Sequence, residues 1–76
     1  MNREEVQRTL KDKGISEDMY SLNGGLPNES YCLEKGKDVW EVYYSERGVK
    51  TSLRLFDTED EACQHLLKRV VRMSEL

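Results

Sequence analysis

The chain is poor in histidine, cysteine and proline. Its 76 residues include one histidine, two cysteines and one proline. A structural zinc site needs four ligands in paired spacings, which His65 and the scattered Cys32 and Cys63 do not supply. Nucleophilic catalysis needs a base beside its nucleophile, and the lone histidine falls on the polar side of an expected helix. We therefore expect no metal, no cofactor, no small-molecule substrate and no enzymatic activity.

Long hydrophobic runs are also missing. No apolar stretch approaches the roughly 18 residues that mark a membrane-spanning helix. Residues 1–14 lack the hydrophobic segment of a secretory signal. We therefore expect a cytoplasmic protein with no membrane partner, whose two cysteines are free thiols in a reducing compartment.

An excess of basic residues is absent as well. The chain has 15 acidic and 12 basic residues and a net charge of −3. Binders of the phosphate backbone normally carry a basic excess on one face, so we expect no nucleic-acid partner. Charged residues make up 36% of the chain, above the typical share of about 25%, which is typical of a small domain with much surface and little core. The length allows a single domain over residues 1–76.

Helix signals stand at both ends of the chain. Asn2 is a good N-cap, and apolar residues one turn apart follow it, which predicts a helix over residues 2–13. Thr58 is followed three residues later by Glu61, the spacing of a capping box. Apolar residues then recur at helical spacing through residues 59–73, namely Ala62, Cys63, Leu66, Leu67, Val70 and Val71.

Alternating residues between the helices predict three strands, over residues 30–34, 39–45 and 50–56, joined by short glycine-containing turns. One face of this sheet is apolar and is expected to be the core: Tyr31, Leu33, Trp40, Val42, Tyr44, Leu53 and Leu55. The other face is expected to be open to solvent: Cys32, Glu34, Glu41, Tyr43, Ser52 and Arg54.

The predicted fold class is therefore α+β, in the order α-β-β-β-α, with a three-stranded antiparallel sheet and two helices packed on one face. Residues 16–29 show no regular pattern, and we expect an ordered loop or a short edge strand there.

Two polar groups are candidate binding sites, and each has a structural alternative. Acidic residues cluster at 57–61, where they suit the start of a helix or form a patch for a basic partner. Tyr43 and Arg54 are expected on the open sheet face, where they are interface anchors or an ordinary cross-strand pair.

The order α-β-β-β-α is also that of the double-stranded-RNA-binding domain. That family carries a basic cluster at the start of its second helix. Residues 58–62 are acidic instead and would repel a phosphate backbone, so charge disfavours this alternative.

Four segments resemble another family: GI at 14–15, YSLNGG at 20–25, WEVYYSERG at 40–48 and FDTEDEAC at 56–63. In these the chain resembles the very small immunity proteins encoded beside bacterial polymorphic or contact-dependent toxins. The resemblance implies a cytosolic inhibitor of contact-dependent growth inhibition that binds a cognate toxin domain, expected to be basic, and occludes its active site. A regulatory or adaptor protein that binds a non-toxin partner is the alternative.

The expected contact residues lie on the open sheet face, at the tip of the second hairpin and around the acidic start of the second helix. They are Glu41, Tyr43, Glu46, Arg47, Arg54, Asp57, Glu59 and Asp60.

Overall fold

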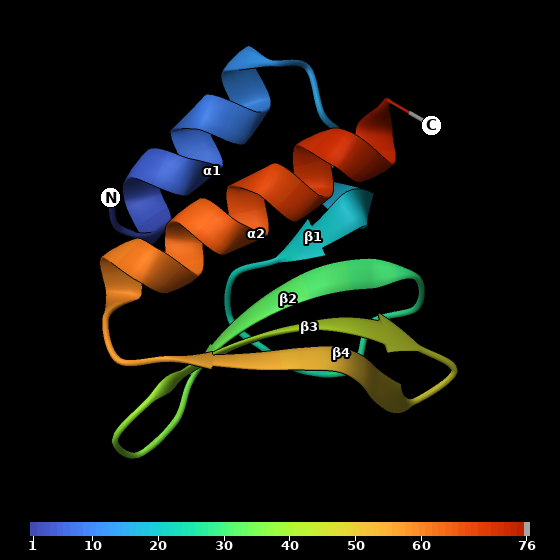
Figure 1. The fold of residues 1–76 in the computed structure, drawn as a ribbon. Coiled ribbons are helices and arrows are strands. Elements are labelled where there is room, and N and C mark those ends of the chain that lie inside the picture. Colours follow the sequence, from blue (N-terminus) through green and yellow to red (C-terminus); the bar gives the residue numbers. More distant parts are fainter. Residues whose placement is uncertain (76) are drawn as a thin grey trace.

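A computed structural model describes residues 1–75 and confirms the α+β class. Two helices cover one face of a four-stranded sheet (Figure 1). The elements in chain order are α1 (Arg3–Asp12), the 3-10 turn η1 (Glu17–Met19), β1 (Tyr20–Ser21), β2 (Ser30–Lys35), β3 (Trp40–Glu46), β4 (Val49–Phe56) and α2 (Glu59–Ser74).

The sheet has the order β1-β2-β3-β4, so the prediction of three strands was wrong by one. β2, β3 and β4 pair antiparallel as expected, but β1 pairs parallel to β2, with Tyr20 opposite Tyr31. The sheet is therefore mixed. A two-residue strand is too short to show an alternating pattern, which is why the sequence left this segment open between loop and strand.

Both helices begin at the residues that their caps predict. The Asn2 side chain accepts a hydrogen bond from the Glu5 amide at 2.9 Å, and Thr58 Oγ1 accepts one from the Glu61 amide at 3.2 Å. The capping box differs in one detail, because the Thr58 hydroxyl is also paired with Glu61 Oε1 at 2.9 Å. Within residues 1–75, neither helix combines the length and the apolar character needed to cross a bilayer.

The main core lies between the sheet and the helices, as predicted. Leu33 and Val42 of the central strands are buried there with the apolar stripes of both helices. The helix residues of this cluster are Val6, Leu10, Ala62, Cys63, Leu66 and Val70. The aromatic side chains of Tyr31 and Trp40 are half-buried and pack against its margin.

A β-bulge reverses the predicted faces of β4. Near the turn, Tyr44 pairs with Thr51, and this register would continue by placing Leu53 opposite Val42. One extra residue enters β4 between these pairs, so Arg54 lies opposite Val42 instead. Ser52, within the bulge, has φ +54°. Because a shift of one residue moves every side chain to the other face, the expected core residues Leu53 and Leu55 are 48% and 59% exposed.

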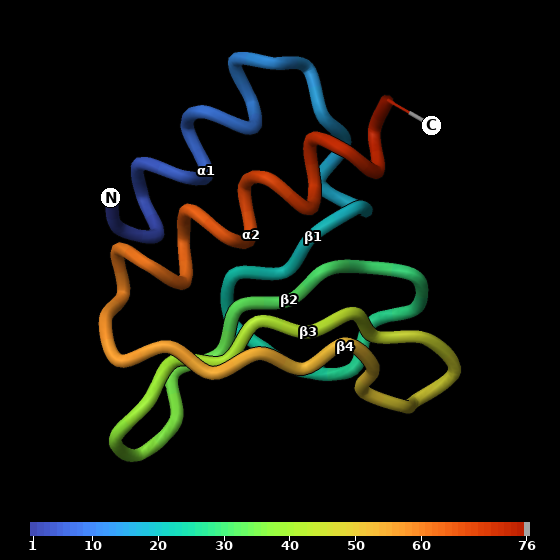
Figure 2. Tube along the Cα trace, in the orientation of Figure 1, coloured from blue at the N-terminus to red at the C-terminus, as the bar shows by residue number. Residues whose placement is uncertain are grey.

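The sheet face away from the helices is covered over β2 and β3 and exposed only along β4, which corrects the prediction that the whole face is open to solvent. Cys32, Tyr43 and Ser45 lie on this face and are fully buried. Residues 22–29, which lead from β1 to β2, pass across it (Figure 2). The loop-covered face, defined by these three residues, is therefore a second, smaller buried region.

Candidate functional site

The eight expected contact residues do not form one surface. Glu46 and Arg47 lie at the turn between β3 and β4, whereas the acidic residues lie beyond the far end of the eight-residue β4. Arg54 lies on the helix side of the sheet, because it is the cross-strand partner of Val42. Glu41 lies on the opposite side. Which of these exposed side chains contacts a partner stays a prediction.

Tyr43 has to be removed from the candidate surface, because its side chain is buried. Its hydroxyl lies 2.7 Å from the Gly25 carbonyl oxygen and 2.8 Å from Glu34 Oε1, and its proton goes to either acceptor. Burial, followed by the hydrogen bond to Glu34, raises the pKa of this phenol far above its usual value. Tyr43 thus fastens residues 22–29 to the sheet and does not anchor a partner.

A lysine pairs with the two carboxylates beside Tyr43 and offsets part of their charge. Lys50 Nζ lies 3.5 Å from Glu41 Oε1 and 3.9 Å from Glu34 Oε1. The same ammonium group lies over the Tyr43 ring, 4.5 Å from its centroid. Glu41 is therefore occupied in a local network, which reduces the charge that this face presents to a partner.

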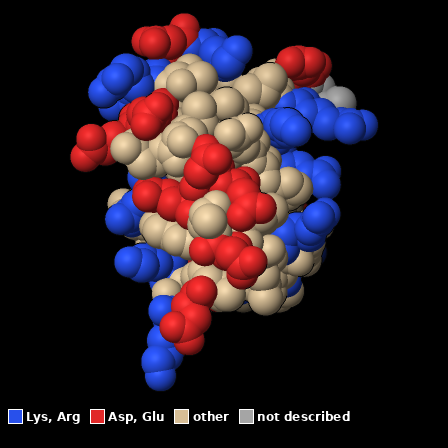
Figure 3. Space-filling model, turned by 60° about the vertical axis from the view of Figure 1, so that its left-hand side comes forward, with Lys and Arg blue, Asp and Glu red and all other residues tan. Residues whose placement is uncertain are grey.

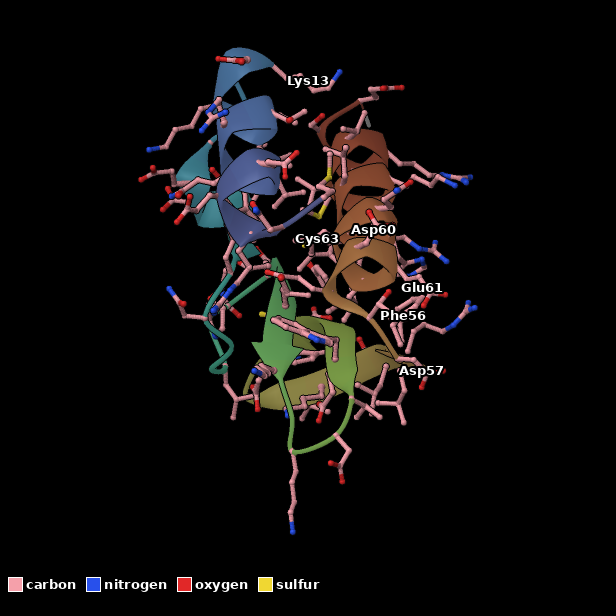
Figure 4. All side chains as sticks on the ribbon, turned by 90° about the vertical axis from the view of Figure 1, so that its left-hand side faces the viewer. Lys13, Phe56, Asp57, Asp60, Glu61 and Cys63 are labelled. Carbon is pink, nitrogen blue, oxygen red and sulfur yellow. The ribbon has the colours of Figure 1, made fainter. Side chains whose placement is uncertain are left out.

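Carboxylates gather where the two helices begin, and Figure 3 shows them on one side of the molecule. We call this region the acidic end and define it by Asp57, Glu59, Asp60 and Glu61. The Met1 ammonium group pairs with Asp60 Oδ1 at 2.6 Å, and the Arg3 amide donates to Glu59 Oε2 at 3.1 Å. Figure 4 shows Asp57 at the end of β4, below the first turn of α2.

These contacts divide the acidic end into occupied and available carboxylates. Hydrogen bonds from the Met1 ammonium group and from Gln64 lower the pKa of Asp60, so this carboxylate is ionised at neutral pH. Glu61 is held at the cap of α2. Asp57 is exposed and forms no ion pair within residues 1–75. At Glu61 the structural alternative is confirmed, because this residue takes part in the cap at the start of α2. That Asp57, Glu59 and Asp60 bind a partner stays a prediction.

A cationic groove between α2 and the sheet was not predicted. We define it by Arg54, His65, Lys68, Arg69 and Arg72. Arg69 and Arg72 form one wall of a cleft of about 250 Å³ that also contacts Tyr31, Tyr44 and Ser52. The two tyrosine rings are in contact, with centroids 5.0 Å apart. Arg69 and Arg72 thus lie at the margin of an aromatic hollow, and they line a second cleft together with His65 and Lys68.

The basic side chains of this groove form no ion pair within residues 1–75, since no carboxylate there lies within ion-pair distance of Arg54, Lys68, Arg69 or Arg72. His65 packs against Phe56 with ring centroids 5.1 Å apart. Burial lowers the pKa of this histidine, and Arg69, Arg54 and Lys68 lower it further. The groove therefore gathers basic side chains although the net charge of the whole chain is −3.

One sequence signal could have indicated the groove. Basic residues at 68, 69 and 72 share one side of the second helix, but the sequence interpretation assigned them to its negative C-terminal end. Arg54 joins them only because of the bulge. No pattern in residues 50–56 predicts that shift, so the complete groove was accessible only from the structure.

Neither cysteine reaches the surface. Cys32 and Cys63 are free, fully buried, and lie on opposite faces of the sheet. Burial raises the pKa of each thiol to about 11, so both are protonated at neutral pH. No three His, Cys, Asp or Glu side chains within residues 1–75 converge on a point where an ion would bind.

Comparison of the chain with protein-family models, with curated proteins and with solved structures finds no match.

Proposed function

We propose that this protein is an immunity protein, which binds a cognate bacterial toxin domain in the cytoplasm and neutralises it by occluding its active site. The proposal begins from the four segments that resemble such proteins. The observation that carries it is the acidic end, where the start of α2 brings carboxylates together beside Asp57, which is exposed.

Charge explains how such an end would inhibit a toxin. An enzyme that acts on a polyanion has a basic active site, which attracts carboxylates as it attracts its substrate. Complementary charge accelerates encounter and fixes the orientation of the complex. We propose that Asp57, Glu59 and Asp60 enter the basic active site of the toxin. The turn residues Glu46 and Arg47, at the other end of the sheet, are a second proposed contact.

Binding to the toxin encoded by the neighbouring upstream gene tests the proposal. Titration calorimetry and a growth assay in cells that express the toxin measure affinity and protection. We expect Asp57→Lys to weaken binding roughly tenfold or more, mainly through slower association. Asp12→Lys is the matched control, because Asp12 is exposed at the other end of α1 and the change in charge is the same. The absence of binding at micromolar concentrations would contradict the proposal.

A regulatory module with a non-toxin protein partner is the second candidate. The cationic groove favours it, because arginine beside aromatic rings is typical of protein interfaces whatever the partner does. Capture from a cell extract that contains no toxin, followed by identification of the bound protein, would support this candidate. A gel shift with duplex RNA at low salt distinguishes both from an RNA-binding domain.

A further inference from the structure

We infer that the free edge of β4, together with the cationic groove beside it, binds an extended acidic segment of a protein partner, which joins the sheet as a fifth strand. This surface adjoins the acidic end but shares no residue with it, and the inference does not depend on toxin neutralisation. Its occupant follows from three features: an unpaired strand edge, basic side chains beside it that form no ion pair within residues 1–75, and exposed leucines on the opposite face.

The edge of β4 is available for pairing. β4 is the last strand of the sheet and pairs with β3 on one side only. All of its residues except Phe56 are exposed, so nothing within residues 1–75 covers it. The outer edge of such a strand presents unpaired amide and carbonyl groups, which bind an extended peptide by strand addition.

The charge beside this edge selects the chemistry of the added strand. Successive side chains of a strand point to opposite faces of the sheet. One set of alternate side chains would therefore face the groove, where Arg54, Arg69 and Arg72 have no carboxylate partner within residues 1–75. The other set would lie beside Leu53 and Leu55, which are on the face away from the helices. The complementary segment alternates acidic and apolar residues.

The bulge limits where this strand pairs. Ser52 interrupts the regular geometry of β4, and a bulge ends or weakens pairing. Residues 53–56 form the part of the edge beyond it and carry both Arg54 and Leu55. We therefore place the added strand along residues 53–56, with its acidic side chains toward α2.

A second copy of this chain is a poor occupant. Symmetric pairing of two β4 strands about an axis perpendicular to the sheet would place both α2 helices on the same side. The basic side chains of the two grooves would then lie on the same side of the joined sheet, and the Arg54 side chains of both copies would share that side. Like charges in such positions are destabilising, so a heterologous acidic segment fits better.

A model peptide tests the inference with the intact protein. The probe is an acetylated and amidated heptapeptide that alternates glutamate and valine, titrated into ¹⁵N-labelled protein at low salt. We expect chemical-shift changes at residues 53–56 and 65–72, and slower amide exchange in β4. Arg69→Glu combined with Arg72→Glu should lower the affinity roughly tenfold or more. Arg8→Glu with Lys37→Glu changes the net charge equally at exposed positions elsewhere and should have little effect.

Two peptide analogues separate charge from strand pairing. Replacing each glutamate by glutamine removes the charge, and methylating alternate backbone nitrogens removes donors and blocks one edge. Each change should abolish most of the binding, and retention of full affinity by either analogue would overturn the inference. Equal affinity for a duplex RNA, or concentration-dependent self-association through β4, would overturn it as well. Arg54→Gln provides a milder variant if the double charge reversal does not fold.

This experiment is independent of the proposed immunity function. Asp57→Lys, which should impair toxin binding, removes a negative charge next to residues 53–56, so the affinity for the acidic peptide should stay the same or rise. Arg69→Glu with Arg72→Glu should lower the affinity for the peptide more than the affinity for the toxin. Failure of one proposal can therefore be distinguished from failure of the other.

Discussion

The two faces of the central strands are buried to the same degree by different means. On the helix side, Leu33 and Val42 lie beneath two amphipathic helices. On the other side, Cys32 and Tyr43 are equally inaccessible, although only an irregular segment passes over them. Alternation along a strand tells which residues share a face. It does not tell whether that face is open, because a loop covers it without any periodic pattern of its own.

The largest effect is expected from a cavity in the helix-side core. Leu33→Ala should lower the free energy of unfolding by about 2–5 kcal/mol, because it removes a fully buried side chain from between the sheet and α2. Leu55→Ala is the matched control, since Leu55 is 59% exposed, and its effect should stay within about 0.5 kcal/mol. Urea denaturation followed by circular dichroism measures both. Similar losses of stability from the two variants would contradict the exposed position of Leu55.

The next largest loss of stability is expected from Gly24→Ala, in the segment 22–29 that covers the second face of the sheet. The φ of Gly24 is +70°, and a Cβ atom there would collide with the Glu34 carboxylate. Gly24→Ala should cost about 2–3 kcal/mol, the sum of backbone strain and displacement of Glu34 from Tyr43. Gly48→Ala isolates the strain, because Gly48 has φ +76° and open space around it, and should cost about 1–2 kcal/mol. Equal costs in thermal or urea unfolding would mean that the Glu34 contact contributes nothing.

A smaller loss is expected from removing the hydroxyl that holds this cover. Tyr43→Phe should cost about 1–2 kcal/mol, because the Gly25 carbonyl and Glu34 lose a buried donor. Tyr44→Phe is the control, since no hydrogen bond of its hydroxyl is present within residues 1–75, and its effect should stay within about 0.5 kcal/mol.

The same hydroxyl also gives a pH signature. The pKa of Tyr43 is raised in the folded protein by burial and by Glu34, so the unfolded chain ionises first as the pH rises. The stability that the Tyr43 hydroxyl contributes is fully present below the pKa of the unfolded chain, about 10, and declines as the pH rises above it. Urea midpoints between pH 8 and 11 should therefore fall more steeply for the native protein than for Tyr43→Phe. Parallel profiles would show that Tyr43 is accessible to solvent.

Local chemistry predicted the parts of the fold that depend on neighbours in the chain. Asn2 and Thr58 mark the helix starts because a cap acts within one turn. Leu33 and Val42 were placed in the core because their alternation is regular. The path of residues 22–29 depends on a distant contact, between the Tyr43 hydroxyl and Gly25. That contact left no periodic trace in the sequence.

The candidate sites show the same division. The acidic end was predictable because residues 57–61 are contiguous in the chain. The cationic groove was not, because Arg54 and Arg69 come from different elements and lie near the same residue, His65, only in the folded protein. Tyr43 was placed on an interface because the cover over its face was not foreseen.

The smallest effect is expected at Ser52, the residue whose bulge exchanges the faces of β4. A non-glycine residue at φ +54° is strained by about 1–2 kcal/mol, and glycine relieves this strain but loses about 0.5–1 kcal/mol through unfolded-state entropy. Ser52→Gly should therefore stabilise the protein by about 0.5 kcal/mol, whereas the β-branched Ser52→Val should destabilise it by a similar amount or more. If valine instead stabilises the protein, β4 has lost its bulge. Cross-strand NOEs would then pair Leu53 with Val42, and Arg54 would leave the groove.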